Sequence, residues 1–414
     1  MARLVLRGAT LFDSAAGVLR PSTTVVIDGG RVRTVTQEPL TVDEARCIDL
    51  AGRVVLPGLV DAHVHVTAAT HDLSAQATQP VSFVAAQSSR ILREMLLRGF
   101  TTVRDAAGAD AGLQEAVERG LFEGPRLFIA GFPISQTGGH ADMRPRAWRG
   151  APLACSCAGL GLFGAIADGV GEVRRAVREQ VRTGANHIKI MAGGGVASPS
   201  DPIDGTQFSV EELRAAVEEA EAANLYALAH AYSPRAVSRA VEAGVRSIEH
   251  GNLIDEQTVR LMKQRGTYLV PTLATYAALA DEGARLGWSA SMLDKLERVR
   301  EQGVQAIRLA REEGVPVAFG TDLLGHMHPR QSTEFALRRA VQSPVEILQG
   351  ATIVAARLMR QEGAIGQVVP GAWADLLVVE GDPTRELDML EQPDRGVTLI
   401  MQAGRIVKND LGRA

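Results

Sequence analysis

The chain has 414 residues, more than the roughly 250–300 that one hydrophobic core usually spans, so we expect one large domain and a smaller one. Apolar residues make up 46% and charged residues 22% of the chain, which is typical of a globular protein and excludes a disordered, collagen-like or disulfide-rich chain. A formal net charge of -4 and an aromatic content of 4% indicate neither a basic nor a base-stacking surface, so we expect no nucleic-acid or membrane-surface partner.

Cysteine use and the first residues of the chain indicate a reducing compartment. Cys47, Cys155 and Cys157 are too few for a disulfide framework, and Cys155 and Cys157 lack the spacing of a structural zinc site. The chain starts with a strand-like alternation rather than a signal-peptide pattern, and no apolar stretch approaches the roughly 20 residues that span a bilayer. We therefore expect a cytoplasmic protein.

Both ends of the chain are predicted to form short β-strands. Residues 1–57 contain alternating runs such as LVLRGATLF and TTVVIDGGRVRTV, with a hairpin turn at Asp28–Gly29–Gly30. Residues 364–414 show the same pattern in ADLLVVEGD and GVTLIMQAGRIVKND. We expect these two segments to form one small β domain.

The middle of the chain, residues 58–363, alternates between apolar runs and helical segments. Helical periodicity is clear in SVEELRAAVEEAEAAN, which opens with a capping box of Ser209 and Glu212. Strand–helix alternation predicts a parallel sheet, and eight repeats over roughly 300 residues favour a (β/α)₈ TIM barrel over the alternative, a doubly wound sheet. The eight predicted strands are 59–66, 100–105, 126–132, 186–191, 225–230, 245–250, 267–271 and 315–321.

Two further segments, 133–169 and 272–290, are longer than ordinary connections, and long structured insertions are often functional. The run Gly193-Gly194-Gly195 lacks the Gly-Lys-Ser/Thr of a phosphate-binding loop. We interpret it as room for the backbone after the fourth strand.

The first predicted strand of the barrel carries His63 and His65. Residues two apart in a strand share a face, so both imidazoles should point into the barrel. Two imidazoles on one face can bind one metal ion, although such a pair alone is more often packed or exposed. The hypothesis gains weight because the pair lies at the carboxyl end of a barrel strand, where barrel enzymes keep their active sites.

Four more candidate ligands fall at equivalent places. Lys189 lies in the fourth strand between two isoleucines that should face the helices, so the lysine faces inward, where it is either salt-bridged or converted by carbon dioxide into a carbamate able to bridge two metals. His230, His250 and Asp322 end the fifth, sixth and eighth strands. Each alone is more often structural, but their common register predicts a metal site.

With these residues in place, almost the whole chain resembles the metal-dependent amidohydrolase superfamily. Within it, HIKIMAGGG, AHAYS, SIEHGN and TGGHAD resemble the branch of prolidase-like dipeptidases, carboxypeptidases and ochratoxin-hydrolysing amidases. The resemblance implies a β-sandwich formed by both termini, 1–57 and 364–414, beside the barrel of 58–363. It also implies two divalent ions, zinc above all, with His63, His65 and Asp322 on one ion, His230 and His250 on the other, and N6-carboxylated Lys189 bridging.

The same resemblance implies a reaction and a set of substrate contacts. A metal-bridging hydroxide would attack an amide or peptide bond next to a free carboxylate, with Asp322 as the proton carrier. The substrate would be a dipeptide, an N-acyl amino acid or an ochratoxin-like conjugate. His140 and Tyr232 are candidates for contact with the substrate carbonyl or carboxylate, and His328 and Arg330 are weaker candidates; the alternatives are a surface histidine and a core tyrosine.

Two other functions are compatible with the scaffold. A deaminase or cyclic-amide hydrolase is the first, but mononuclear deaminases need a carboxylic acid near the fifth-strand histidine, and Ala231-Tyr232-Ser233 follow His230. A non-enzymatic scaffold protein is the second, and it would have lost one or more ligands, none of which is missing here. The resemblance also implies a homo-oligomer.

Overall fold

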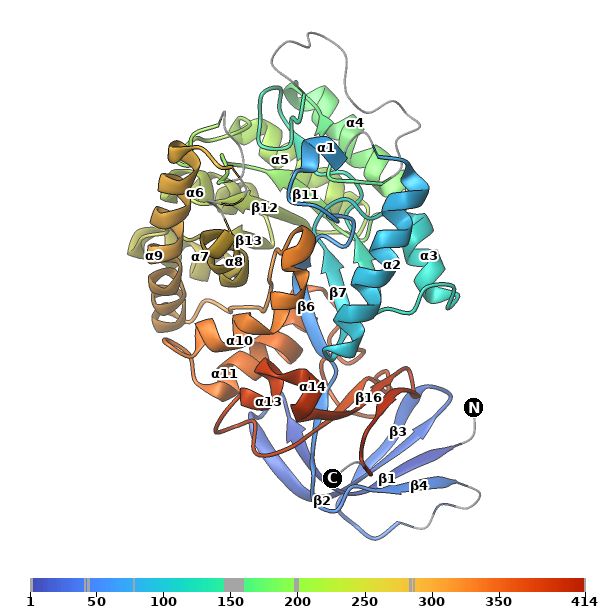
Figure 1. The fold of residues 1–414 in the computed structure, drawn as a ribbon. Coiled ribbons are helices and arrows are strands. Elements are labelled where there is room, and N and C mark those ends of the chain that lie inside the picture. The colour runs from blue at the N-terminus through green and yellow to red at the C-terminus, as the bar shows by residue number, and fades with distance from the viewer. Residues whose placement is uncertain are drawn as a thin grey trace.

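The computed structural model combines a β-sheet built from both ends of the chain with parallel strands and helices built from its middle (Figure 1). Residues 145–159 of the predicted insertion, including Cys155 and Cys157, lie outside the described residues. The structure describes residues 3–40, 42, 45–76, 79–144, 160–196, 201–282, 285 and 287–412.

Within these ranges, eight strands from both ends of the chain pair in one sheet, in the order β17-β16-β15-β5-β1-β2-β3 with β4 paired to β1. β15 pairs antiparallel with β5, so the C-terminal segment lies beside the strand that leads into the middle of the chain. The domain boundaries at 57/58 and 363/364 stay predictions. The strands are β1 (Leu4–Asp13), β2 (Val18–Asp28), β3 (Arg31–Thr36), β4 (Arg46–Asp49), β5 (Val54–Pro57), β15 (Leu376–Val379), β16 (Val397–Gln402) and β17 (Arg405–Asn409).

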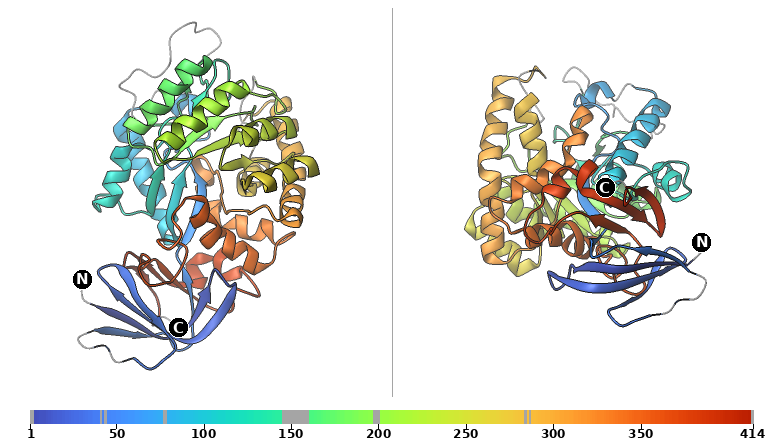
Figure 2. Two further views of the ribbon diagram at one scale, coloured as in Figure 1. Left: turned by 180° about the vertical axis from the view of Figure 1, so that it is seen from behind. Right: turned by 60° about the horizontal axis from the view of Figure 1, so that its bottom comes forward.

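The predicted hairpin turn is confirmed, and it shows how the sheet bends. Gly29 and Gly30 connect β2 to β3 with φ of 59° and 79°, the left-handed backbone that a two-residue turn of this hand requires. A Cβ on Gly30 would lie 2.7 Å from the Ala403 carbonyl oxygen, in the turn between β16 and β17. Strands at opposite ends of the pairing order therefore face each other across a shared core, as the right-hand view of Figure 2 shows.

Seven of the eight predicted strands of the middle segment are confirmed among the described residues, and all of their pairings are parallel. Together with two short strands that were not predicted, β9 and β10, they form a three-stranded sheet (β6-β7-β8) and a six-stranded sheet (β10-β9-β11-β12-β13-β14). The strands are β6 (Leu59–Val64), β7 (Phe100–Asp105), β8 (Arg126–Ile129), β9 (Ile134–Ser135), β10 (Ala165–Ile166), β11 (Ile188–Met191), β12 (Ala227–Ala231), β13 (Ser247–His250) and β14 (Tyr268–Val270).

The eighth predicted strand, 315–321, is not a regular strand. A single parallel bridge joins Val317 to Leu269 of β14, and the Phe319 carbonyl accepts a hydrogen bond from Ala62 N of β6 at 2.8 Å. Other groups compete for the same backbone, because Phe319 N donates to the Gly350 carbonyl and an Arg338 guanidinium nitrogen donates to the Ala318 carbonyl. The segment nevertheless lies between β14 and β6 and carries Asp322 to the ends of the strands.

Helices cover the outer face of these strands (Figures 1 and 2). The predicted capping box of Ser209 and Glu212 is confirmed at the start of α5. The α-helices are α1 (Leu73–Gln76), α2 (Val81–Leu97), α3 (Ala111–Glu118), α4 (Gly169–Arg182), α5 (Val210–Ala222), α6 (Pro234–Ala243), α7 (Glu256–Arg265), α8 (Leu273–Glu282), α9 (Ala290–Glu313), α10 (Thr333–Arg338), α11 (Pro344–Gln349), α12 (Ala355–Leu358), α13 (Asp388–Glu391) and α14 (Pro393–Gly396). A 3₁₀-helix spans Gly325–Ser332 and a π-helix spans Gly350–Val354.

Alternation along the strands sorts side chains into the core and the interior. Ile188 and Ile190 of β11 and Ala229 of β12 pack in one cluster with apolar residues of α4 to α7. Lys189 and His230, which alternate with them, therefore face the other way.

No helix of the described ranges combines the length and apolarity needed to cross a membrane. The cytoplasmic location and the homo-oligomeric state stay predictions.

Candidate active site

A cavity of about 80 Å³ lies at the carboxyl ends of the parallel strands. It is lined by all six predicted metal ligands and by His140 and Tyr232. The remaining lining residues are mostly apolar: Leu73, Pro133, Ala141, Met143, Leu162, Met191, Val196, Thr275, Tyr276, Leu279 and Leu324. Such a combination of a few polar groups within apolar walls is typical of a small-molecule site.

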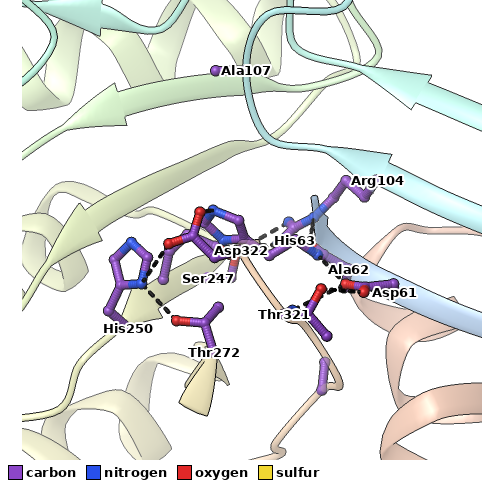
Figure 3. A network of polar contacts seen from close by, with 12 residues as sticks. Asp61, Ala62, His63, Arg104, Ala107, Ser247, His250, Thr272, Thr321 and Asp322 are labelled. Carbon is purple, nitrogen blue, oxygen red and sulfur yellow. Dashed lines mark hydrogen bonds and ion pairs between the residues drawn. The ribbon is translucent and has the colours of Figure 1, made fainter. Parts of the chain in front are cut away.

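Asp322 lies between His63 of β6 and His250, which ends β13 (Figure 3). Its Oδ1 lies 3.1 Å from His65 Nε2 and 3.5 Å from His63 Nε2, and its Oδ2 lies 3.9 Å from His250 Nδ1. Burial alone would raise the pKa of Asp322, but the imidazole rings of His63 and His65 beside the carboxylate hold it well below its usual range. The carboxylate is therefore ionised.

Backbone and side-chain acceptors fix which nitrogen each histidine of β6 offers to the cavity. His63 Nδ1 lies 2.7 Å from Glu249 Oε2, and His65 Nδ1 lies 2.9 Å from the Ala107 carbonyl oxygen. Both acceptors require a proton on Nδ1, which leaves the Nε2 lone pairs free. His63 Nε2 is buried and has no hydrogen-bond partner. A metal ion is the group that would satisfy it.

The histidines of β12 and β13 are held in the same way. His230 Nε2 donates to the Gly194 carbonyl at 3.0 Å, which leaves Nδ1 to the cavity, and His250 Nδ1 lies 2.8 Å from Thr272 Oγ1, a hydroxyl that can donate or accept. Their ring centroids are 4.6 Å apart, and His250 lies 5.1 Å from His63. Burial lowers the pKa of His230 and of His250 well below the usual value, so both are neutral, as metal ligands must be.

The donor set fits divalent ions such as zinc. His63, His250 and Asp322 each offer a ligand atom, and these atoms lie within 4.8 Å of one another. Imidazole nitrogens and a carboxylate oxygen are ligands that zinc accepts. Lys189 lines the same cavity from β11 and is 1% exposed, and burial lowers the pKa of its amine to about 8.

Three residues of the site adopt a left-handed backbone that side chains with a Cβ rarely adopt. The φ angles are 75° for His250, 50° for Thr272 and 54° for Asp322. A β-branched residue such as Thr272 is especially unusual there. Strain of this kind persists where the surrounding structure holds the residue for function, which supports the assignment of the site.

A buried ion pair between Arg104 and Glu249 holds His63 in place, and this pair was not predicted from the sequence. Arg104 of β7 and Glu249 of β13 are both 0% exposed, and Arg104 Nη2 lies 2.8 Å from Glu249 Oε1 and 2.9 Å from Glu249 Oε2. Burial would raise the pKa of Glu249, but the charge of Arg104 and the hydrogen bond from His63 keep the carboxyl ionised. The only signal in the sequence was the inward parity of both residues in their strands.

His140 and Tyr232 line the cavity beside His230 and His250. The His140 ring stacks on that of His230 with centroids 4.3 Å apart, and its Nδ1 lies 3.2 Å from Asp201 Oδ2. A Cβ on Gly195 would lie 1.8 Å from His140 Cε1, so the glycine run after β11 makes room for this ring. Tyr232 Oη lies 2.9 Å from the hydroxyl of Tyr276, a residue of the 272–290 segment that was not singled out from the sequence.

The two weaker candidates for substrate contact are not among the residues that line this cavity. His328 is buried, its Nε2 donates to the Ala68 carbonyl at 2.9 Å, and burial lowers its pKa to about 4. Arg330 forms ion pairs with Asp281 and Glu282. The placement of His328 and Arg330 therefore gives their predicted contact no support.

Comparisons with known proteins agree with this site. The model of the amidohydrolase family matches residues 54–407. The ochratoxinase of Aspergillus niger is 32% identical over 380 residues, which cover 86% of this chain and 76% of that protein. The crystal structure of a prolidase complexed with N-methylphosphonate-L-proline is 47% identical, with a TM-score of 0.95 over 98% of this chain and 100% of that one. A Xaa-Pro dipeptidase with bound methionine is 30% identical, with a TM-score of 0.87 over 99% and 100% of the two chains.

The family match covers most of the chain, and the similar structures extend over nearly all of it. These findings confirm the resemblance inferred from the sequence: the chain belongs to the amidohydrolase family and is a hydrolytic enzyme.

Proposed function

We propose that this amidohydrolase cleaves an amide or peptide bond next to a free carboxylate, in a dipeptide, an N-acyl amino acid or an ochratoxin-like conjugate. The observation that carries the proposal is the convergence of four histidines, one lysine and one aspartate on a single cavity, with the tautomers of His63, His65 and His230 fixed by hydrogen bonds to acceptors. The names of the relatives, an ochratoxinase, a prolidase and a Xaa-Pro dipeptidase, support the substrate class.

The donor atoms suit two divalent ions, which we propose to be zinc. His63, His65 and Asp322 would hold one ion, and His230 and His250 would hold the other. An N6-carboxylated Lys189 would supply an oxygen to both, since its inward side chain and its burial favour loss of the ammonium charge. When bound, the ions would supply an activated water at neutral pH and a Lewis acid for the scissile carbonyl.

Asp322 is the residue we propose to move the proton. Its carboxylate is ionised, and its two oxygens face the His63–His65 side and the His250 side of the cavity. It can therefore accept the proton of the attacking water and pass it to the leaving amine. His140 and Tyr232 would donate hydrogen bonds to the substrate, because both line the cavity.

We also propose that the parallel strands close into an eight-stranded barrel. The segment 315–321 would be the eighth strand, because it hydrogen-bonds to β14 on one side and to β6 on the other. The two sheets also meet at β8, the other edge of the three-stranded sheet, because Asn186 N, two residues before β11, donates to the Ile129 carbonyl of β8 at 2.8 Å.

A hydrolysis screen with metal analysis tests the proposed function. The protein would be produced with zinc and bicarbonate and assayed on dipeptides and N-acyl amino acids, each paired with a C-terminally amidated counterpart. We expect about two zinc ions per chain and faster hydrolysis of the free acids. Fewer than about one metal per chain would overturn the binuclear centre, and equal rates on acids and amides would overturn the requirement for a carboxylate.

A variant separates the two roles of Asp322. Asp322→Asn should retain substantial zinc and lose most turnover, because an amide can still contribute an oxygen but cannot accept the proton. Loss of zinc in parallel with turnover would show that Asp322 is only a ligand.

A further inference from the structure

Thr272 and Tyr276 connect a proposed metal ligand to a proposed substrate contact. Thr272 Oγ1 lies 2.8 Å from His250 Nδ1 and 3.5 Å from Tyr276 Oη. Tyr276 Oη lies 2.9 Å from Tyr232 Oη. All four side chains are buried, and together they form an unbroken row of polar groups.

The row acquires a direction if His250 offers Nε2 to a metal. Nδ1 then carries the ring proton and donates a hydrogen bond to Thr272 Oγ1. The Thr272 hydroxyl keeps its own proton, which it donates to Tyr276 Oη, and Tyr276 in turn donates to Tyr232. One proton remains at the end of the row, on the Tyr232 hydroxyl, and Tyr232 lines the cavity.

The surrounding structure holds each member of the row in place. Thr272 keeps its left-handed φ of 50° directly before α8, and Ala274 N in the first turn of that helix donates to the buried Glu334 carboxylate at 2.7 Å. The Tyr232 ring stacks on the His250 ring with centroids 5.1 Å apart and an interplanar angle of 14°. Neither end of the row can move without disturbing the other.

We infer that Thr272 and Tyr276 are positioning residues that couple metal binding at His250 to substrate binding by Tyr232. Thr272 fixes the ring proton of His250 on Nδ1, and Tyr276 directs the Tyr232 proton into the cavity. The part that concerns Tyr232 rests on the proposed function. A row of hydrogen bonds polarises each successive donor, so each member strengthens the last one.

Zinc affinity tests the metal end without any turnover. Thr272→Val keeps the shape and the β-branch of the side chain and removes the hydroxyl, whereas Thr272→Ser keeps the hydroxyl. By competition with a chelator, we expect Thr272→Val to bind zinc about 10–100-fold more weakly than the unmodified protein and Thr272→Ser to bind it about equally. Thr272→Ala, which removes the β-branch and so lowers the left-handed strain, repeats the comparison if Thr272→Val does not fold. Unchanged zinc affinity in the hydroxyl-free variants would overturn the inference.

A double-variant cycle tests the substrate end. We would measure the dissociation constant for N-methylphosphonate-L-proline and the kcat and KM for a dipeptide in Tyr232→Phe, Tyr276→Phe and the double variant. We expect about 10–100-fold weaker binding for Tyr232→Phe, about 2–10-fold for Tyr276→Phe, and a double variant no weaker than Tyr232→Phe alone.

The outcomes are separable. Losses that multiply in the double variant, or a Tyr276→Phe enzyme that matches the unmodified one, would overturn the coupling through Tyr276. If the unmodified protein neither binds the phosphonate nor hydrolyses any dipeptide, the proposed substrate class fails, and the zinc comparison of the Thr272 variants still decides the metal end.

Discussion

The buried pair of Arg104 and Glu249 should be indispensable to the metal-free fold and to the placement of His63. All three guanidinium nitrogens of Arg104 donate hydrogen bonds inside the protein. Their acceptors are the Ala62 carbonyl, Ser247 Oγ and both carboxylate oxygens of Glu249. Glu249 Oε2 in turn accepts a hydrogen bond from His63 Nδ1. Both charged side chains are fully buried, so neither can reach solvent if its partner is removed.

Glu249→Gln keeps the shape of the side chain and removes its charge. An uncompensated buried charge costs about 3–5 kcal/mol, so the free energy of unfolding should fall by that amount. Arg104→Met should lower the free energy of unfolding by a similar amount, because it leaves the negative charge of Glu249 buried without a partner. The double variant removes both charges and should lose less than the sum of the two single losses, with a coupling energy of about 0.5–3 kcal/mol. Zinc affinity should fall about 10–100-fold in Glu249→Gln, because His63 loses its anionic acceptor.

Urea unfolding of the metal-free protein, followed by circular dichroism, measures the stability term, and chelator competition measures the zinc term. Glu218→Gln is a matched control: it removes a carboxylate that is 51% exposed and paired with Arg174, so it should change the stability by at most about 1 kcal/mol. If Glu249→Gln unfolds within about 1 kcal/mol of the unmodified protein and binds zinc equally well, the argument for the buried pair is refuted.

Three further predictions address single residues. Lys189→Ala should abolish activity, and short-chain carboxylic acids should partly restore it; unimpaired turnover would exclude the carbamate. Gly195→Ala should lower turnover by up to about 100-fold with zinc retained, because its Cβ displaces His140, whereas Gly193→Ala, whose Cβ contacts begin at 3.3 Å, should be tolerated. In the folded protein the pKa of His328 is lowered to about 4. Below pH 6.5 this histidine therefore binds a proton in the unfolded chain but not in the folded protein. The free energy of unfolding, measured with a metal chelator present, should fall as the pH drops from 6.5 to 4. Replacement of His328 by Gln should remove about 3 kcal/mol of that fall, and an unchanged pH profile would contradict the shift.

Side-chain alternation was sufficient to find the ligands that lie within strands. Lys189 stands between Ile188 and Ile190, and both isoleucines pack in the outer core, so the lysine must face inward. His63 on β6 and His65, one residue after it, follow the same rule. These placements depend on neighbours in the sequence, which is why they can be predicted from it.

The groups that sequence reasoning missed depend on partners far apart in the chain. Arg104 and Glu249 are 145 residues apart and meet only because β7 and β13 face the same interior. Tyr276 reaches Tyr232 across 44 residues. Apart from the inward parity of Arg104 in its strand, nothing near Arg104 or Tyr276 in the sequence distinguishes them from a solvent-exposed arginine or a core tyrosine.

His250 shows where alternation stops being a guide. Glu249 faces inward to His63, so strict alternation would turn His250 outward, where Ile248 lies. The left-handed backbone of His250, with φ of 75°, brings its ring back to 5.1 Å from that of His63. Asp322 makes the same departure at the end of its segment, and its amide is held by the His63 carbonyl at 2.8 Å. A strand can present consecutive residues to one cavity only by leaving the pleat at its last residue, and contacts to the neighbouring strand stabilise that departure. The ligands that complete the site are therefore at the positions where a periodic pattern carries the least information.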